Sequence, residues 1–193
     1  MTQIPDSGHA FHHRDAAELA AGLPDVLASP QGQGPVALLV RRPAPGKREM
    51  LDSVELSITE GVVGDDWAAR GSRSTPDGGP DPDSQVTLMN IRLARLVAVT
   101  DDRVPLAGDQ IYVDLDLSID ALPAGTRLAV GAAVIEVTTK PHLPCDLFAN
   151  RFGRAAARFV NTPEHRALRL RGAAARVIEP GTVRVGDQVR VLG

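Results

Sequence analysis

A stretch of strict alternation near the middle of the chain constrains the fold most. In IYVDLDLSI, residues 111–119, apolar side chains occupy every second position and polar side chains mostly occupy the positions between them. This period of two predicts a strand with one buried face. Shorter strand-like segments, separated by glycine and proline, lie on both sides of it, at residues 36–42, 53–60, 85–89 and 132–140.

The same strand pattern returns at the C-terminus, where residues 173–192 predict a strand, a turn and a strand. Helices do not alternate with these strands as they do in a βαβ protein. We therefore expect a mainly β protein with peripheral helices (α+β), built on a closed or nearly closed β-barrel.

The expected helices lie at the edges of the strand pattern. Asp15 is positioned to cap a helix that runs to about residue 28, and residues 151–161 have one apolar face at helical spacing. We expect residues 1–35 to form an N-terminal tail and helix, and residues 36–193 to form the barrel domain.

Composition excludes several classes of protein. The net charge of −3 and the 3% of aromatic residues argue against broad nucleic-acid binding and against a base-stacking surface. The longest apolar runs are too short to cross a bilayer, and the N-terminus has no apolar stretch typical of a signal peptide. A single cysteine excludes an internal disulfide and fits a reducing compartment. We expect a cytoplasmic protein that binds neither nucleic acid nor a membrane.

The single cysteine lies in TTKPHLPCDLFANRFGR, between a predicted strand and a predicted helix. A thiol reacts as the thiolate, which nearby cations favour. The basic residues Lys140, His142, Arg151 and Arg154 lie close to Cys145 in the sequence. Such a thiol could ligate a soft metal ion, bind an anion or carry a sulfur atom. The segment also permits a small buried apolar side chain, and sequence alone leaves both alternatives open.

A long irregular segment, residues 71–84, is the second candidate region. Loops of this length within a small domain are often functional. Arg70 and Arg73 could close over a ligand as a lid. Asp65 and Asp109 could fix a loop or contact a substrate, and a Gly-Asp turn that only shapes the barrel explains them equally well.

The order of several segments resembles the MOSC domain family, which is named for the C-terminus of molybdenum cofactor sulfurases, and in particular its small stand-alone bacterial members. The resemblance covers about residues 36–192 and implies a β-barrel of the MOSC type. The segments that carry it are GVVGDDW, QVTLMN, PLAGDQIYVDLDLSIDALPAGTRLAVG, AVGAAVIEVTTKPHLPCDLFANRFGRAAARFVN and GTVRVGDQVRV.

The resemblance identifies Cys145 with the cysteine of the family. In amidoxime-reducing members that cysteine ligates molybdenum of the pterin cofactor, and in sulfurase-linked members the domain is thought to recognise the cofactor and help place sulfur. The resemblance thus implies the molybdenum cofactor (molybdopterin), with Cys145 as metal ligand or as persulfide sulfur carrier. The candidate cofactor contacts are Lys140, His142, Arg151, Arg154, Arg70, Arg73, Asp65 and Asp109.

A molybdenum-dependent reductase of N-hydroxylated compounds would need an electron-transfer protein, and a sulfur carrier would need a sulfur donor. The chain has no room for the pyridoxal phosphate domain of a sulfurase. At residues 144–147 it has Pro-Cys-Asp-Leu, where small relatives tend to have a run like Gly-Cys-Ala-Lys.

Two other functions fit the same residues. A non-catalytic β-barrel module that binds an anion or another protein would keep its binding in a Cys145→Ser variant. A thiol-dependent hydrolase would use Cys145 with His142 and would form a covalent intermediate.

Overall fold

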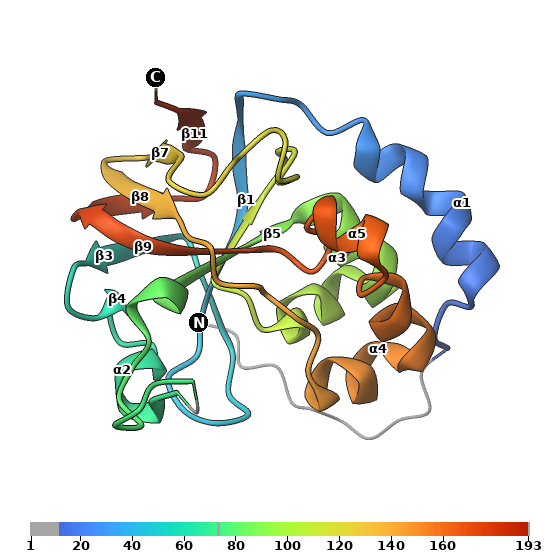
Figure 1. The fold of residues 1–193 in the computed structure, drawn as a ribbon, viewed down its shortest axis with the longest axis horizontal. Helices are drawn as coiled ribbons and strands as arrows, with labels where there is room; N and C mark the ends of the chain where they lie inside the picture. Colours follow the sequence, from blue (N-terminus) through green and yellow to red (C-terminus); the bar gives the residue numbers. More distant parts are fainter. Residues whose placement is uncertain (1–11, 73, 193) are drawn as a thin grey trace.

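The strands at the centre of the molecule close into a barrel (Figure 1). The structure, a computed structural model, describes residues 12–72 and 74–192. Seven strands follow one another around the barrel in the order β11-β7-β8-β9-β5-β6-β1, and a β1–β11 pairing closes it. Their bounds are β1 Gln33–Arg41, β5 Val86–Asn90, β6 Ile111–Val113, β7 Arg127–Val130, β8 Ala133–Val137, β9 Ala173–Glu179 and β11 Gln188–Val191.

The pairing around the barrel is antiparallel except between β5 and β6, which run parallel. The short strand β2, Glu49–Leu51, extends the sheet beyond β1. A second sheet of three strands packs nearby, in the order β10 (Gly181–Arg184), β3 (Ser53–Ser57) and β4 (Gly61–Val62).

Two hydrophobic clusters form the core because successive strand residues point to opposite faces. On β6, Ile111 and Val113 belong to the cluster inside the barrel, whereas Tyr112 belongs to the cluster under the helices. Each of these three side chains is fully buried. A barrel wall covered by helices on the outside therefore needs apolar residues on both faces.

The helices that cover this wall gather on one side of the barrel (Figure 1). They are α1 (Ala16–Leu27), α3 (Ile91–Ala98), η2 (Asp101–Ala107), α4 (Asp146–Phe159) and α5 (Pro163–Ala167). Asp15 caps α1 through a capping box with Glu18, as the sequence predicts. The short helices α2 (Trp67–Arg70) and η1 (Pro82–Ser84) lie on the other side, by the second sheet. No helix within the described residues is long and apolar enough to span a membrane.

The predicted barrel with peripheral helices is confirmed, but three of its elements differ from the prediction. The strand predicted over 111–119 ends at Val113, because the next residues make only isolated backbone bonds, such as Asp116 N to the Pro30 carbonyl at 2.8 Å. The C-terminal segment forms three strands rather than two. The helix expected from residue 151 begins directly after Cys145. The division between residues 1–35 and 36–193 stays a prediction.

Candidate functional site

A pocket of about 320 Å³ opens beside the segment that leads to Cys145. Its walls are the segment after β8, residues 138–143, together with Arg166 of α5 and the segment between α5 and β9, where Arg169, Arg171 and Gly172 line it. Ile119 and Val160 complete the lining. The volume lies near the lower end of the range of roughly 300–1,000 Å³ that is usual for small-molecule sites.

Positive charge dominates the lining of this pocket. Lys140, Arg166, Arg169 and Arg171 line it together with His142, and no aspartate or glutamate is among the lining residues. A concave surface with one sign of charge concentrates ligands of the opposite sign. The pocket is therefore suited to an anion.

Two of the pocket arginines have no carboxylate partner among the described residues. Arg166 donates from Nε to Oδ1 of Asn161 at 2.9 Å. Arg169 donates from Nη1 to the carbonyls of Leu122 at 2.6 Å and Leu117 at 3.4 Å. Burial lowers the pKa of Arg169 below its usual value, which still leaves the guanidinium charged at neutral pH. Their two charges are thus left for a ligand to balance.

The other two cations of the pocket are paired. Lys140 lies 2.8 Å from a carboxylate oxygen of Asp81 and donates to the hydroxyl of Ser74 at 2.7 Å. These contacts hold the long loop, residues 71–84, against the pocket wall. Arg171 donates from Nη1 to Oδ2 of Asp109 at 2.6 Å and from Nη2 to the carbonyl of Ala107 at 3.0 Å.

A buried aspartate lies directly behind the pocket. Asp109 stands between η2 and β6 and is fully buried, and its second oxygen lies 2.7 Å from Nε2 of His142. Burial by itself raises the pKa of Asp109, but Arg171 and His142 outweigh burial and lower it. Burial, together with Arg171, lowers the pKa of His142 despite the opposing effect of Asp109. Asp109 is therefore ionised and His142 neutral near neutral pH, with Nε2–H of His142 as donor.

Gly172 allows this arrangement to form. Its φ of +114° lies in the left-handed region, and a Cβ at this position would lie 2.3 Å from the Leu88 carbonyl oxygen and 3.2 Å from Cδ2 of His142. A side chain here would collide with β5 and press on the histidine ring.

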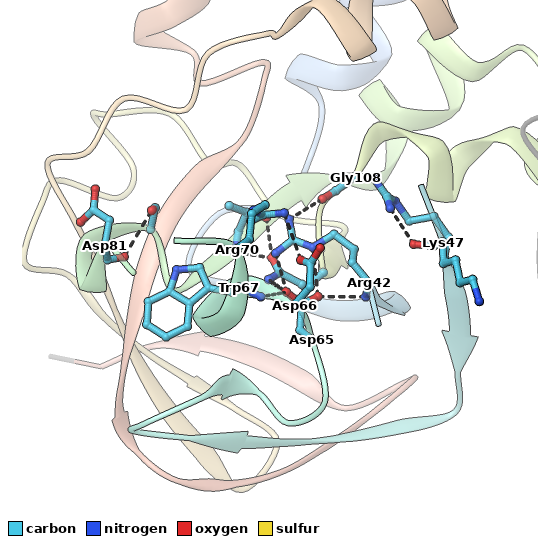
Figure 2. Close-up of polar contacts among 12 residues, drawn as sticks. Arg42, Lys47, Asp65, Asp66, Trp67, Arg70, Asp81 and Gly108 are labelled. Carbon is cyan, nitrogen blue, oxygen red and sulfur yellow. Dashed lines mark hydrogen bonds and ion pairs between the residues drawn. The ribbon is translucent and has the colours of Figure 1, made fainter. Parts of the chain in front are cut away.

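A second aspartate also has a fully buried side chain, and Figure 2 shows its contacts. Asp65, in the turn after β4, accepts two bonds from the Arg42 guanidinium, at 2.8 and 3.0 Å, and one from the Arg42 backbone N at 2.9 Å. The Trp67 backbone N also donates to it, at 3.1 Å. Burial by itself lowers the pKa of Arg42, but Asp65 outweighs burial and raises it. Arg42 uses its remaining nitrogen on the Gly108 carbonyl, at 3.0 Å.

The structure brings together only some of the residues that the sequence singles out. Lys140 and His142 line the pocket, and Asp109 supports His142 from behind. Cys145 is exposed and is the N-cap residue of α4. It is not among the lining residues, but Leu143 is, so its Cα lies within about 7 Å of that wall along the chain.

The remaining candidates lie away from the pocket lining. Arg151 is buried on α4 and donates to the Leu106 carbonyl at 3.0 Å, whereas Arg154 is exposed on the same helix. Arg70 lies 3.1 Å from Asp66 on α2. Asp65 is enclosed by the contacts that Figure 2 shows. Arg73 lies outside the described residues.

Sequence reasoning missed the arginines at 166, 169 and 171. They stand in TPEHRALRLRG, which predicts a short helix ended by Gly172. The helix α5 instead ends at Ala167, and Arg169 has a positive φ of 47°, so the following residues form pocket wall rather than helix surface. The available signal was the density of arginines directly before a predicted strand.

Comparison with known proteins gives one family and several similar structures. The family model for the MOSC domain matches residues 87–190. The crystal structure of the YuaD protein from Bacillus subtilis aligns with a TM-score of 0.61 and 17% identity, over 84% of this chain and 97% of that one. YiiM from Escherichia coli aligns with a TM-score of 0.53 and 16% identity, over 83% and 70%.

YiiM from Geobacillus stearothermophilus gives a TM-score of 0.56 and 14% identity, over 83% of this chain and 75% of that one. At these identities the likeness establishes a shared fold. A search of curated proteins found no match.

Proposed function

Because the chain belongs to the MOSC domain family, we propose that it binds the molybdenum cofactor, or carries sulfur for it, through Cys145 and the basic pocket beside it. The observation that carries this proposal is the charge of the pocket. Arg166 and Arg169 face it without a carboxylate partner among the described residues, in a cavity of about 320 Å³.

The residues present fit the chemical groups of this cofactor. Its terminal phosphate needs cations, which Arg166 and Arg169 supply as planar donors of two or more hydrogen bonds. Molybdenum accepts a soft thiolate ligand, and Cys145 is exposed rather than sealed in the core. Lys140, His142 and Arg154 are further candidates for contact with the ligand.

A bound molybdenum centre would supply the redox chemistry for reducing an N-hydroxylated compound. The electrons would come from a separate electron-transfer protein, since a chain with one cysteine cannot hold a four-cysteine iron–sulfur cluster. In sulfur transfer, the Cys145 thiolate would instead attack the outer sulfur of a persulfide on a donor protein, the donor's thiolate would leave, and Cys145 would hold that sulfur as a persulfide.

The proposal is tested by the composition of the purified protein. The protein is prepared from a host that makes molybdenum cofactor, without reducing agent, beside its Cys145→Ser variant. Molybdenum content, pterin content and intact mass are measured on both. Stoichiometric metal and pterin that the variant lacks would establish Cys145 as the metal ligand, and an added sulfur atom on Cys145 without metal would establish sulfur carriage. The proposal would be overturned if, with cofactor supplied in excess, the protein contained neither metal and pterin nor an added sulfur atom.

A second function, a non-catalytic module that binds an anion, is favoured by one observation. Cys145 is not among the residues that line the pocket. Anion binding in the pocket would then not require the thiol. In that case Cys145→Ser would retain the affinity for the anion while Arg169→Gln would lose it.

A further inference from the structure

His142 lines the pocket and has one ring nitrogen that the described chain leaves without a hydrogen bond. Nε2 is held by Asp109 at 2.7 Å, whereas Nδ1 makes no hydrogen bond within the described chain and is not buried. The side chain is 20% exposed and is part of the pocket lining. Since Nε2 carries the proton, Nδ1 presents a lone pair and is a hydrogen-bond acceptor.

The ring is fixed in this orientation from two sides. Asp109 is fully buried and is itself held by Arg171 at 2.6 Å, so its carboxylate cannot turn away from the histidine without leaving a buried charge unpaired. Gly172 lies against Cδ2 of the ring, where an added Cβ would be 3.2 Å away. Nδ1 is therefore a preorganised acceptor rather than one orientation among several.

This acceptor stands among donors. The charged side chains that line the pocket are lysine and arginine, which can only donate hydrogen bonds. Arg171, which is 5% exposed, also has a buried Nε–H with no partner among the described residues. An anion that offers only acceptors would satisfy the arginines and leave Nδ1 without a partner, which costs binding free energy.

We propose that His142 makes the pocket selective for anions that carry an O–H or N–H donor beside the negative charge. Arg166 and Arg169 hold the negative oxygens, and Nδ1 of His142 accepts the hydrogen. This selectivity rests on the anion pocket of the proposed function and adds a chemical requirement to its ligand. Hydrogen phosphate and protonated phosphate esters meet the requirement, whereas sulfate does not.

Hydrogen phosphate and sulfate form a matched pair of probes. Above neutral pH both are tetrahedral dianions of similar size, and only hydrogen phosphate has an O–H. We expect the wild-type protein to bind phosphate about 3- to 10-fold more tightly than sulfate, the difference that one hydrogen bond makes. Isothermal titration calorimetry at constant ionic strength measures both affinities.

The variant His142→Gln removes the acceptor Nδ1 and can keep the hydrogen bond to Asp109 that holds the side chain in place. The glutamine amide N–H occupies nearly the place of Nε2–H and can keep the bond to Asp109, but the variant has no Nδ1. We expect this variant to bind phosphate and sulfate equally and to unfold at nearly the wild-type temperature.

Two arginine variants test where the anion binds. Arg169→Gln should weaken the binding of both anions by about 10- to 100-fold. Arg184→Gln, an exposed arginine on β10 outside the pocket lining, should change neither.

The outcomes distinguish this inference from the proposed function. Equal wild-type affinities for the two anions, or a phosphate preference that survives in His142→Gln, would overturn the role of His142 while leaving cofactor binding through Cys145 untouched. Anion binding that Arg169→Gln does not weaken would overturn the placement of the anion in this pocket.

A nitrogen-detected NMR spectrum of the imidazoles gives a second test that needs no variant. It should show His142 protonated at Nε2 alone, with the Nδ1 signal moving when phosphate is added. Protonation at Nδ1 in the free protein would contradict the inference.

Discussion

The molecule contains two buried Asp–Arg clusters, and they differ in whether the residues that donate to the carboxylate also line the pocket. The Asp65 cluster, formed by Asp65 with Arg42, is closed, because its carboxylate accepts from Arg42, from the Gln110 amide at 3.4 Å and from the Trp67 backbone N, and none of these residues lines the pocket. The Asp109 cluster, formed by Asp109 with Arg171 and His142, is open, because both donors also line the pocket.

The two clusters are chemically alike and adjacent, since Arg42 also donates to the carbonyl of Gly108, the residue before Asp109 (Figure 2). A buried carboxylate with an arginine is therefore not by itself a sign of function. What distinguishes the open cluster is that one of its donors has a second polar atom that the protein leaves available.

The largest expected effect is the loss of stability when the carboxylate of the closed cluster is removed. Asp65→Ala leaves the Arg42 charge buried without its partner, so we expect the free energy of unfolding to fall by about 3–5 kcal/mol. Asp66→Ala is the matched control, because its partner Arg70 is 46% exposed and stays solvated without the carboxylate, so we expect a smaller loss than in Asp65→Ala. Urea unfolding measures both. Equal losses in the two variants would contradict the closed cluster.

A smaller loss of stability is expected at Gly172, which lies against His142 of the open cluster. Gly172→Ala forces a side chain into a left-handed position against the Leu88 carbonyl and the ring of His142, so we expect a loss of about 1–3 kcal/mol and a weaker preference for phosphate. Gly186→Ala is the control, since Gly186 has a φ of +91° but open space around it. If both variants lose the same stability, the contact with His142 has no effect of its own.

The two ionisable groups of the open cluster, His142 and Asp109, should affect the stability of the protein in different ranges of pH. Because the pKa of His142 is lowered in the folded protein, only the unfolded chain takes up this proton as the pH falls through about 6.5, and the free energy of unfolding decreases. Asp109 acts differently. Its pKa is also lowered, so its contribution is present above the ordinary carboxyl pKa of about 4 and is lost only below that.

This dependence is measured by urea unfolding of the wild type and of His142→Gln across the acidic range. The decrease around the ordinary histidine pKa should be smaller in the variant. Identical profiles for the two proteins would show that His142 is not held neutral.

The smallest effect is expected at an ion pair on the pocket rim. Lys140 is 32% exposed where it meets Asp81, so Lys140→Met should lower the free energy of unfolding by only about 0.2–1 kcal/mol. Limited proteolysis of the loop at residues 71–84 should accelerate, because Lys140 also bonds Ser74 in that loop. An unchanged cleavage rate would show that this contact does not hold the loop.

Much of the fold could be predicted from local sequence patterns. Period-two segments separated by glycine and proline predicted the barrel, and Asp15 marked the start of α1. The pattern failed at residues 114–119, where alternation continues but the backbone makes only isolated bonds, such as Asp114 N to the Pro35 carbonyl at 3.0 Å. Periodicity reports which side chains are buried, and it does not report where a partner strand ends.

The site was only partly predictable. His142 and Lys140 lie close to Cys145 in the sequence, and in the structure both line one pocket, whereas their role in binding a cofactor stays a prediction. Arg169 and Arg171 reach the same pocket from a segment more than twenty residues away, because β8 and β9 are neighbours in the barrel. No local pattern shows which distant strands will pair, so the pairing of Asp109 with His142 and Arg171 required the structure.

The most direct test of whether an anion binds at the open cluster is a phosphate titration of the wild-type protein, monitored through its backbone amide NMR signals. We expect the shifts to concentrate in residues 138–142 and 166–172 around the open cluster, while the signals of Arg42, Asp65 and Trp67 in the closed cluster stay in place. Shifts centred on the closed cluster, or no saturable shift in the pocket, would contradict this expectation.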